Sequence, residues 1–395
     1  MQNHSPPANS AMSTADEAYR RARALVPTLA ERAQRCEDMR RCPPETIADL
    51  AAAGLLDICK PGRYGGMELD WGVVSEVGRI LSHGCASQAW VCTVLNGHNQ
   101  LVGTFAPEAQ EEVWGQNREA RLAASVGPVG KARAAKGGAV LSGRFPFASG
   151  IDYADWLMGG AMFERDGARP AYFEFLIPAR DARIVDDWHA AGLAGSGSKS
   201  FEVDEAFVPP HRVQDHAHSE LGGGPGTQVN AAPVFRTPRT TVAVHCFSSI
   251  AVGIAETFLE TYVAHTRQRK GRGGAENDLV AAAHHSGVAM ESARIEALSA
   301  YQAKCLADWV ARLDAGAALD AHDRQRARFQ AAWIARQAMQ SVQALFASAG
   351  AHAILESNLL QRQVRDLMAV AAHRGLFLEE AAPAYTKAIL DRGHD

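Results

Sequence analysis

Two histidines in this sequence could exchange a proton with a ligand. His98 lies in LNGHNQ on an apolar helical stretch, and His373 follows QRQVRDLMAVAAH near the end of the last long helix. Imidazole changes its charge near neutral pH, which suits it to acid–base chemistry. Each histidine also has a structural explanation, His98 as a core residue and His373 as a cation favoured by the helix dipole. Local sequence leaves both interpretations open.

A third position with a reactive side chain is Ser149. Together with Gly150 it interrupts an aromatic strand pattern in GRFPFASGIDYADW, residues 143–156. Serine and glycine are common turn residues, so a β-turn is the simplest interpretation of this stretch. Taken alone, the segment predicts a turn between two strands.

The cysteines and the remaining histidines do not predict a metal site. The cysteines are scattered, odd in number and without a C-x-x-C pair, which argues against a disulfide framework and against zinc. His284 and His285 are adjacent, and His216 and His218 lie beside a glycine-rich loop. Neither pair has carboxylate or cysteine company at ligand spacing, so we expect no metal. The cysteines are Cys36, Cys42, Cys59, Cys85, Cys92, Cys246 and Cys305.

The glycine-rich stretch GLAGSGSKS, residues 192–200, raises the possibility of a dinucleotide-binding loop. Such a loop must follow a strand and open a helix, whereas this one leads into FEVDEAFVPP, which reads as another strand. A tight loop between strands is therefore the better interpretation, and no P-loop is evident either. Any redox chemistry in this chain would need reducing equivalents supplied from elsewhere.

Composition describes an ordinary globular protein of two or three domains. The chain has 395 residues, of which 47% are hydrophobic and 21% are charged. A net charge of −4 argues against a dedicated nucleic-acid binder. Apolar runs are too short for a transmembrane span, so no membrane is expected. The polar N-terminus lacks a signal core, which favours the cytoplasm.

Hydrophobic periodicity divides the chain into segments and predicts an α+β fold. Residues 1–120 show helical spacing and form an N-terminal helical domain. Residues 121–213 contain short Gly- or Pro-bounded strands of an antiparallel β-domain. Residues 214–240 form a Gly/Pro-rich connection, either a linker or a mobile active-site loop. Residues 241–395 carry long apolar stripes that predict a C-terminal four-helix bundle.

These segments and several motifs resemble the acyl-CoA dehydrogenase superfamily over nearly the whole chain. The resemblance is closest to the flavin-dependent monooxygenase branch, meaning the oxygenase components of two-component phenol hydroxylases and dibenzothiophene-type monooxygenases. GGAVLSGRFPFASG departs slightly, with Phe145 where the family usually has tryptophan. The other stretches that carry the resemblance are AGLLDICKPGRYGG, the Ser87-Gln88-Ala89-Trp90 helix with His98, FAPEAQEEVWG, DDWHAAGLAGSGSKSFEVDEAFVPPHRV and LLQRQVRDLMAVAAH.

The resemblance implies roles for particular residues around a flavin. Ser149 would hydrogen-bond near flavin N5, and Gly150 would let the backbone approach closely. Trp90 and Phe147 would form apolar walls of the cofactor site. Arg267, in HTRQRKGRGG, is similar to a family arginine near the flavin phosphates.

The two histidines would serve the chemistry. By resemblance, His373 would face the oxygen-reactive carbon of the flavin and could steer protonation of a C4a-hydroperoxyflavin, since the unperturbed pKa of histidine is near neutrality. His98 would bind or deprotonate a substrate hydroxyl, making an aromatic ring electron-rich. Reduced FMN or FAD, with no metal, would come from a separate NAD(P)H-dependent flavin reductase. The phenolic or fused-ring substrate would be hydroxylated in a homotetramer.

Three other functions remain open at this point. A thioester dehydrogenase on the same fold needs a carboxylate base. The family's Tyr-Glu-Gly-Thr type motif is absent after Arg365-Asp366, although Glu379 and Glu380 follow later. Nitrogen or sulfur oxygenation also occurs in this branch. A catalytically silent scaffold is a further alternative, disfavoured because Ser149, His98 and His373 occur together.

Overall fold

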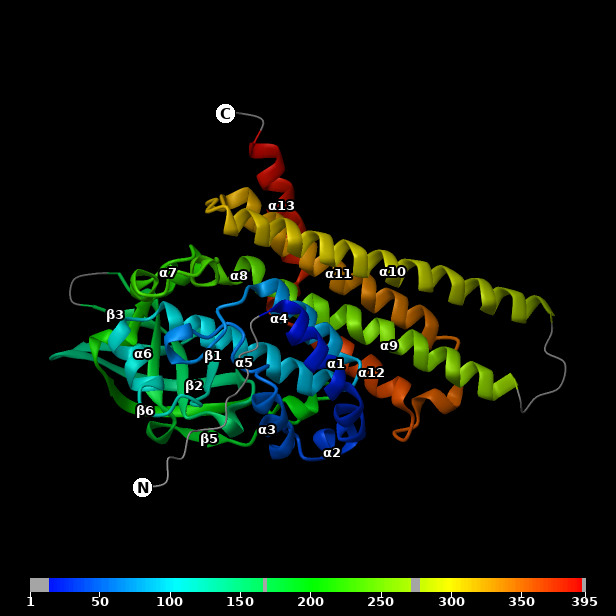
Figure 1. Ribbon diagram of the computed structural model, residues 1–395, viewed down its shortest axis with the longest axis horizontal. Helices are drawn as coiled ribbons and strands as arrows, with labels where there is room; N and C mark the ends of the chain where they lie inside the picture. Colours follow the sequence, from blue (N-terminus) through cyan, green and yellow to red (C-terminus); the bar gives the residue numbers. More distant parts are fainter. Residues whose placement is uncertain (1–13, 166–168, 271–277, 393–395) are drawn as a thin grey trace, which may run out of the picture.

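The structure is a computed structural model that describes residues 14–165, 169–270 and 278–392. Figure 1 shows a sheet at one end of the molecule, long helices extending from the other end, and shorter helices between them. Among the described residues, no helix is both long enough and apolar enough to span a bilayer. The predicted class, helices followed by a sheet and then by a helical bundle, is confirmed.

The first part of the chain is helical, as predicted. Asp70 caps α4 by accepting hydrogen bonds from the backbone N–H groups of Gly72 and Val73. Helix α5 is buried along most of its length because it contacts α4, the first strand and the bundle. The helices are α1 (Ala15–Glu31), α2 (Ala33–Asp38), α3 (Pro44–Ala52), α4 (Trp71–Ser82), α5 (Ala86–Thr104) and α6 (Pro107–Trp114).

Seven strands follow and form one sheet in the order β5-β6-β2-β1-β3-β4-β7. They are β1 (Leu122–Ala135), β2 (Gly138–Ala148), β3 (Trp156–Glu164), β4 (Ala171–Pro178), β5 (Arg183–Val185), β6 (Lys199–Val208) and β7 (Val213–Asp215). The strand that follows the GLAGSGSKS loop is β6, and a single 3₁₀ turn, η4 (Ala194–Ser196), precedes it.

The prediction of a purely antiparallel sheet is wrong for one pair. Strands β1 and β3 are parallel, with Leu122 opposite Trp156, whereas every other neighbouring pair is antiparallel. The cause is the short connection over residues 149–155. Strand β2 ends beside the start of β1, and the connection steps past that point, so β3 begins where β1 begins and runs the same way.

The Gly/Pro-rich connection of residues 214–240 is neither extended nor detached from the core. It contains α7 (His216–Glu220), the 3₁₀ turns η6 (Pro225–Gln228) and η7 (Pro233–Arg236), and the start of α8 (Arg239–Val242). Asn230 Nδ2 donates a 2.7 Å hydrogen bond to the Gly103 carbonyl of α5. A Cβ at Gly226 would lie 2.2 Å from the same oxygen, so the close approach to α5 requires glycine there.

The last part of the chain is the helical bundle. Helices α9 (Val244–Lys270), α10 (Asp278–Asp314), α11 (Ala321–Phe346) and α12 (Leu359–Ala371) pack together, and α13 (Leu378–Asp391) packs on α11 (Figure 1). Four residues of the predicted apolar stripe of α9 are buried in the core, namely Ile250, Ile254, Phe258 and Tyr262, and the fifth, Phe247, is half-buried.

Candidate active site

A cavity of about 490 Å³ lies where α5, α8, α9 and α11 meet the 3₁₀ turn η9 (Arg374–Leu376). This volume suits a ligand of one or a few rings. The cavity is lined by both predicted histidines, His98 and His373. The lining includes Val126 of β1 together with residues of α9 and α11, so the site lies where the sheet approaches the bundle (Figure 1).

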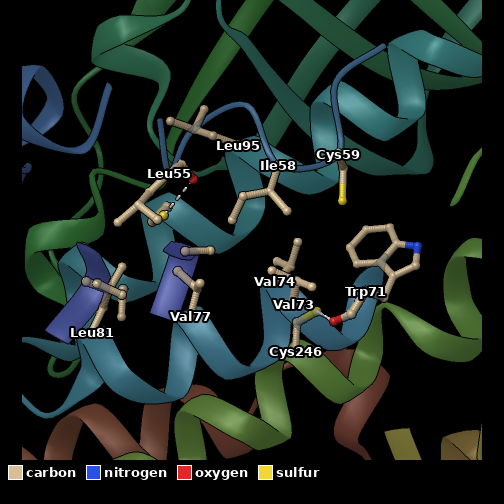
Figure 2. Packing of buried hydrophobic residues seen from close by; sticks show 14 of the residues in the cluster. Leu55, Ile58, Cys59, Trp71, Val73, Val74, Val77, Leu81, Leu95 and Cys246 are labelled. Carbon is tan, nitrogen blue, oxygen red and sulfur yellow. Dashed lines mark hydrogen bonds between the residues drawn. The ribbon is translucent and has the colours of Figure 1, made fainter. Parts of the chain in front are cut away.

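One wall of the cavity continues into the hydrophobic core. Trp71 and Cys246 line the cavity, and both belong to the same packed cluster as Ile58 and Val74. Figure 2 shows these side chains together, with the Cys246 thiol directed at the Trp71 carbonyl at 3.8 Å. Core packing therefore holds this wall of the cavity in place.

His98 is oriented by the sheet. Its Nδ1 lies 2.7 Å from the carbonyl oxygen of Leu122 in β1. A carbonyl can only accept, so Nδ1 carries the proton and Nε2 presents a lone pair. Burial lowers the pKa of His98 to about 4, and the nearby Arg239 charge acts in the same direction. Within the described part of the chain, Nε2 has no hydrogen-bond partner, which leaves it for a ligand.

His373 has the opposite tautomer. It follows α12 and caps η9, where its Nδ1 accepts a 3.1 Å hydrogen bond from the backbone N–H of Gly375. A neutral imidazole that accepts at Nδ1 carries its proton on Nε2, so this ring is a donor. Burial lowers the pKa of His373 to about 4. The expectation of a pKa near neutrality is therefore wrong, since desolvation disfavours the charged ring.

An aromatic stack connects His373 to the predicted Ser149. Trp90 stacks on Phe247 with ring centroids 4.5 Å apart and meets His373 edge-on at 5.7 Å. Its indole Nε1 donates a 3.0 Å hydrogen bond to Ser149 Oγ. Trp90 is buried and thus contacts two of the other predicted site residues, His373 and Ser149, although it does not line the cavity itself.

Ser149 and Gly150 form a turn, and the turn is also part of a polar row. Ser149 Oγ lies 2.6 Å from Ser198 Oγ, which in turn lies 2.7 Å from Ser196 Oγ. Gly150 has a φ of 73°, and its N–H donates to the Ser196 carbonyl at 3.1 Å. The GLAGSGSKS loop therefore supports the Ser149 turn. Neither residue lines the cavity that contains the histidines.

Phe147 and Arg267 lie apart from the cavity. Phe147 is 69% exposed, and its backbone φ of 63° is unusual for a bulky residue. Arg267 is exposed on α9, 20 residues after Phe247 of the cavity wall, which corresponds to about 30 Å along a helix. Within one chain, the structure does not bring Arg267 together with the other predicted residues.

Sequence reasoning missed a buried ion pair beside the cavity. Arg239 of α8 lines the cavity, and its Nη2 donates a 2.6 Å bond to Oε1 of Glu174, which is fully buried in β4. Burial raises the pKa of Glu174, but Arg239 and His216 outweigh it and the net effect lowers that pKa. The only local signal was the arginine in TPRTT, at the end of the glycine-rich connection.

The expectation that His216 has no carboxylate company is wrong. Its Nδ1 lies 2.9 Å from Glu174 and its Nε2 lies 3.3 Å from Glu220. Glu174 is 42 residues away in the sequence, so chain spacing could not indicate that contact. Both carboxylates also lie within 4.0 Å of Arg239, so the group is an ion-pair network. The side chains of His284 and His285 lie outside the described residues.

Several polar atoms in the cavity wall have no partner within the described residues. They are buried, and they include Trp71 Nε1, Thr93 Oγ1, Thr241 Oγ1 and Arg239 Nη1. A buried donor without a partner is costly, and such groups are usually satisfied by a ligand or by water. The wall therefore combines apolar surface with several donors that a polar ligand could use.

The fold and the sequence both place this chain among known proteins. Residues 14–117 match the family described as "Acyl-CoA dehydrogenase, N-terminal domain", and residues 245–377 match "Acyl-CoA dehydrogenase, C-terminal domain". The chain belongs to the acyl-CoA dehydrogenase superfamily, as its motifs predicted.

Individual relatives define the branch. The chain is 33% identical over 366 residues to "Flavin-dependent monooxygenase, oxygenase subunit HsaA" of Rhodococcus jostii (strain RHA1), covering 92% of this chain and 95% of that one. It is 35% identical over 351 residues to the "FADH(2)-dependent resorcinol hydroxylase, oxygenase component" of Rhizobium sp. (strain MTP-10005), covering 86% of each. The crystal structure of 3-HSA hydroxylase from Rhodococcus sp. RHA1 superimposes with a TM-score of 0.90 at 32% identity, covering 95% of this chain and 97% of that one. The chain is thus a member of the flavin-dependent monooxygenase branch.

Proposed function

We propose that this chain is the oxygenase component of a two-component flavin-dependent monooxygenase that hydroxylates an aromatic substrate. The observation that carries this proposal is the pair of neutral histidines in one cavity, with a lone pair on His98 Nε2 and a proton on His373 Nε2. The relatives described above are oxygenase components of the same kind. Both the histidine pair and the relatives disfavour a dehydrogenase.

The flavin would be held beside the Ser149 turn. Ser149, Gly150 and the Trp90 ring would face the flavin, and the ring system of the flavin would cover the exposed Phe147. A bulky residue with positive φ next to that turn is the kind of strain found at ligand sites. Reduced FMN or FAD would supply the activation of dioxygen when bound, and the protein would position it and exclude water.

The histidines would handle protons at defined atoms. His98 Nε2 would accept the proton of a substrate hydroxyl, because its Nδ1–H is fixed on the Leu122 carbonyl. His373 would instead donate a hydrogen bond or a proton from Nε2–H, because its Nδ1 already accepts from the Gly375 N–H. The Trp90–Phe247 stack behind His373 would keep that ring in place and limit the access of water.

Partners and assembly follow as further proposals. A separate NAD(P)H-dependent reductase would supply the reduced flavin, and the protein would act as a homotetramer in which Arg267 reaches a flavin phosphate of a neighbouring subunit. Arg267 lies far from the cavity of its own chain along α9, which supports a contact with the flavin of another subunit. The seven cysteines are free and buried, which suits the reducing cytoplasm.

The function is tested by separating flavin supply from oxygenation. The purified chain receives photoreduced FMN or FAD without oxygen, and then air-saturated buffer with a panel of phenols, naphthols, anilines and thiophenes. We expect a hydroxylated phenol or fused ring as product and no NADH oxidation by the chain alone. Product analysis identifies whether carbon, nitrogen or sulfur receives the oxygen. Flavin reoxidation that yields only hydrogen peroxide across the panel would contradict the proposal.

A further inference from the structure

The cavity wall carries an excess of positive charge. In the part of the chain that the structure describes, four arginines and one glutamate line it. His98 and His373 also line it, but both are neutral at neutral pH because burial lowers each pKa to about 4. The charged lining residues are Arg239, Arg324, Arg328, Arg374 and Glu220.

Two of the four arginines are balanced by carboxylates. Arg239 pairs with the buried Glu174 at 2.6 Å and lies 4.0 Å from Glu220. Arg328, on α11, pairs with Glu380 of α13 at 2.8 Å. Glu220 is the acidic residue of the described lining, and because of these pairs neither arginine contributes a full unbalanced charge.

The other two arginines are not balanced. Arg324 Nη1 donates a 2.6 Å hydrogen bond to the carbonyl of Leu319, which fixes its position without neutralising it. Arg374 directly follows His373 at the start of η9 and is exposed. Among the described residues, no carboxylate lies within ion-pair distance of either side chain. α11 packs on η9, so Arg324 and Arg374 come from two elements in contact at the cavity.

We propose that the substrate is an aromatic acid whose carboxylate is bound by Arg324 and Arg374. The inference rests on the proposed function and deepens it by naming the chemical class of substrate. Guanidinium groups bind carboxylates through paired hydrogen bonds, and a hydrogen bond to Leu319 already orders the Arg324 side chain. The apolar wall formed by Trp71, Val244 and Phe247 accommodates the ring, and His98 receives its hydroxyl.

A phosphate of the flavin has the same anionic chemistry as a carboxylate. The test therefore compares two ligand pairs, each consisting of an anion and its neutral counterpart. The substrate probes are para-hydroxyphenylacetate with its amide and a hydroxynaphthoate with its amide. The cofactor probes are FMN and riboflavin. Dissociation constants are measured by equilibrium dialysis without oxygen, with reduced FMN present for the substrate probes.

For the wild-type protein we expect at least one acid to bind about tenfold more tightly than its amide, the effect of one charge-assisted contact. High salt should weaken binding of the acid and leave the amide unchanged. In Arg324→Gln and in Arg374→Gln the preference for the acid should fall to about twofold or less on the same reasoning. The ratio is taken within one variant, so a partial loss of folded protein does not alter it.

Arg326→Gln is the matched control. Arg326 is on the same helix but contacts the Trp309 ring outside the cavity lining, so this variant should keep the wild-type preference. Equal affinity for acid and amide in the wild type, or an unchanged preference in both variants, would overturn the inference. A loss of FMN affinity relative to riboflavin, with the acid preference intact, would assign the arginines to the cofactor and also overturn it. Arginine-dependent binding of an acid that is never hydroxylated would instead count against the proposed function alone.

Discussion

Replacement of Glu174 by glutamine should destabilise the protein more than any surface charge change. Glu174 is fully buried, and its Oε1 accepts from Arg239 Nη2 at 2.6 Å and lies 2.9 Å from His216 Nδ1. Gln214 Nε2 lies 3.4 Å from Oε2. Glutamine preserves the shape of the side chain but leaves the Arg239 charge buried without its counter-ion.

The magnitude follows from the burial of both partners. Removing one member of a buried ion pair costs about 3–5 kcal/mol, because the remaining charge stays desolvated. For a chain of 395 residues, an unfolding entropy of about 2.1 cal/mol/K per residue converts this cost into a decrease in Tm of about 4–6 °C. The reference variant is Asp308→Asn. It removes the Lys304–Asp308 pair, whose side chains are 67% and 48% exposed, so solvent screens the pair and the free energy of unfolding should change little.

Thermal and urea unfolding of four proteins provides the assay: wild type, Glu174→Gln, Arg239→Met and the double variant. The double variant has neither charge, so it should be distinctly more stable than the sum of the two single effects predicts. Additive effects would refute the reasoning, as would a Glu174→Gln cost no larger than that of Asp308→Asn. Either result would mean that water already screens the pair.

Three other predictions address the site and the assembly. His98→Ala should lower the hydroxylation rate about 10²–10⁴-fold and weaken substrate binding, whereas His373→Ala should divert flavin oxidation to hydrogen peroxide even without substrate. The control is His265→Ala, because His265 is on α9 outside the cavity lining. Equal product yield in all three variants would contradict the assignment. Burial lowers the pKa of both cavity histidines from about 6.5 to about 4, so the unfolded chain binds more protons between these pH values. Stability should be nearly complete at pH 7 and fall by about 1–2 kcal/mol per histidine by pH 5. A difference in unfolding free energy between wild type and a His98→Gln/His373→Gln double variant that does not change with pH would disprove this. Light scattering at micromolar concentration should give a homotetramer, and Arg267→Gln should weaken FMN binding without changing riboflavin binding; a monomer that binds both flavins normally would exclude the contact across subunits.

Much of the fold could be predicted because it depends on local periodicity. The spacing of Phe247, Ile250, Ile254, Phe258 and Tyr262 predicted a helix with one buried face. The structure buries the last four, whereas Phe247 is partly exposed and lines the cavity. FPFASG predicted a strand that ends in a turn, and Gly150 has the positive φ that such a turn needs. The parallel pairing of β1 with β3 could not be predicted, because it depends on which side of β1 the chain passes.

The chemistry of the site was decided by tertiary contacts. The sequence identified His98 and His373 as candidates, but their tautomers depend on the Leu122 carbonyl, 24 residues from His98, and on the backbone N–H of Gly375. Glu174 and Arg239 are 65 residues apart, and nothing in either local sequence indicates that they pair. Residue types and periodicity therefore determined which side chains are available and which helices and strands carry them. Only the tertiary structure decided which of them share one desolvated cavity, because desolvation and pairing depend on distance in space.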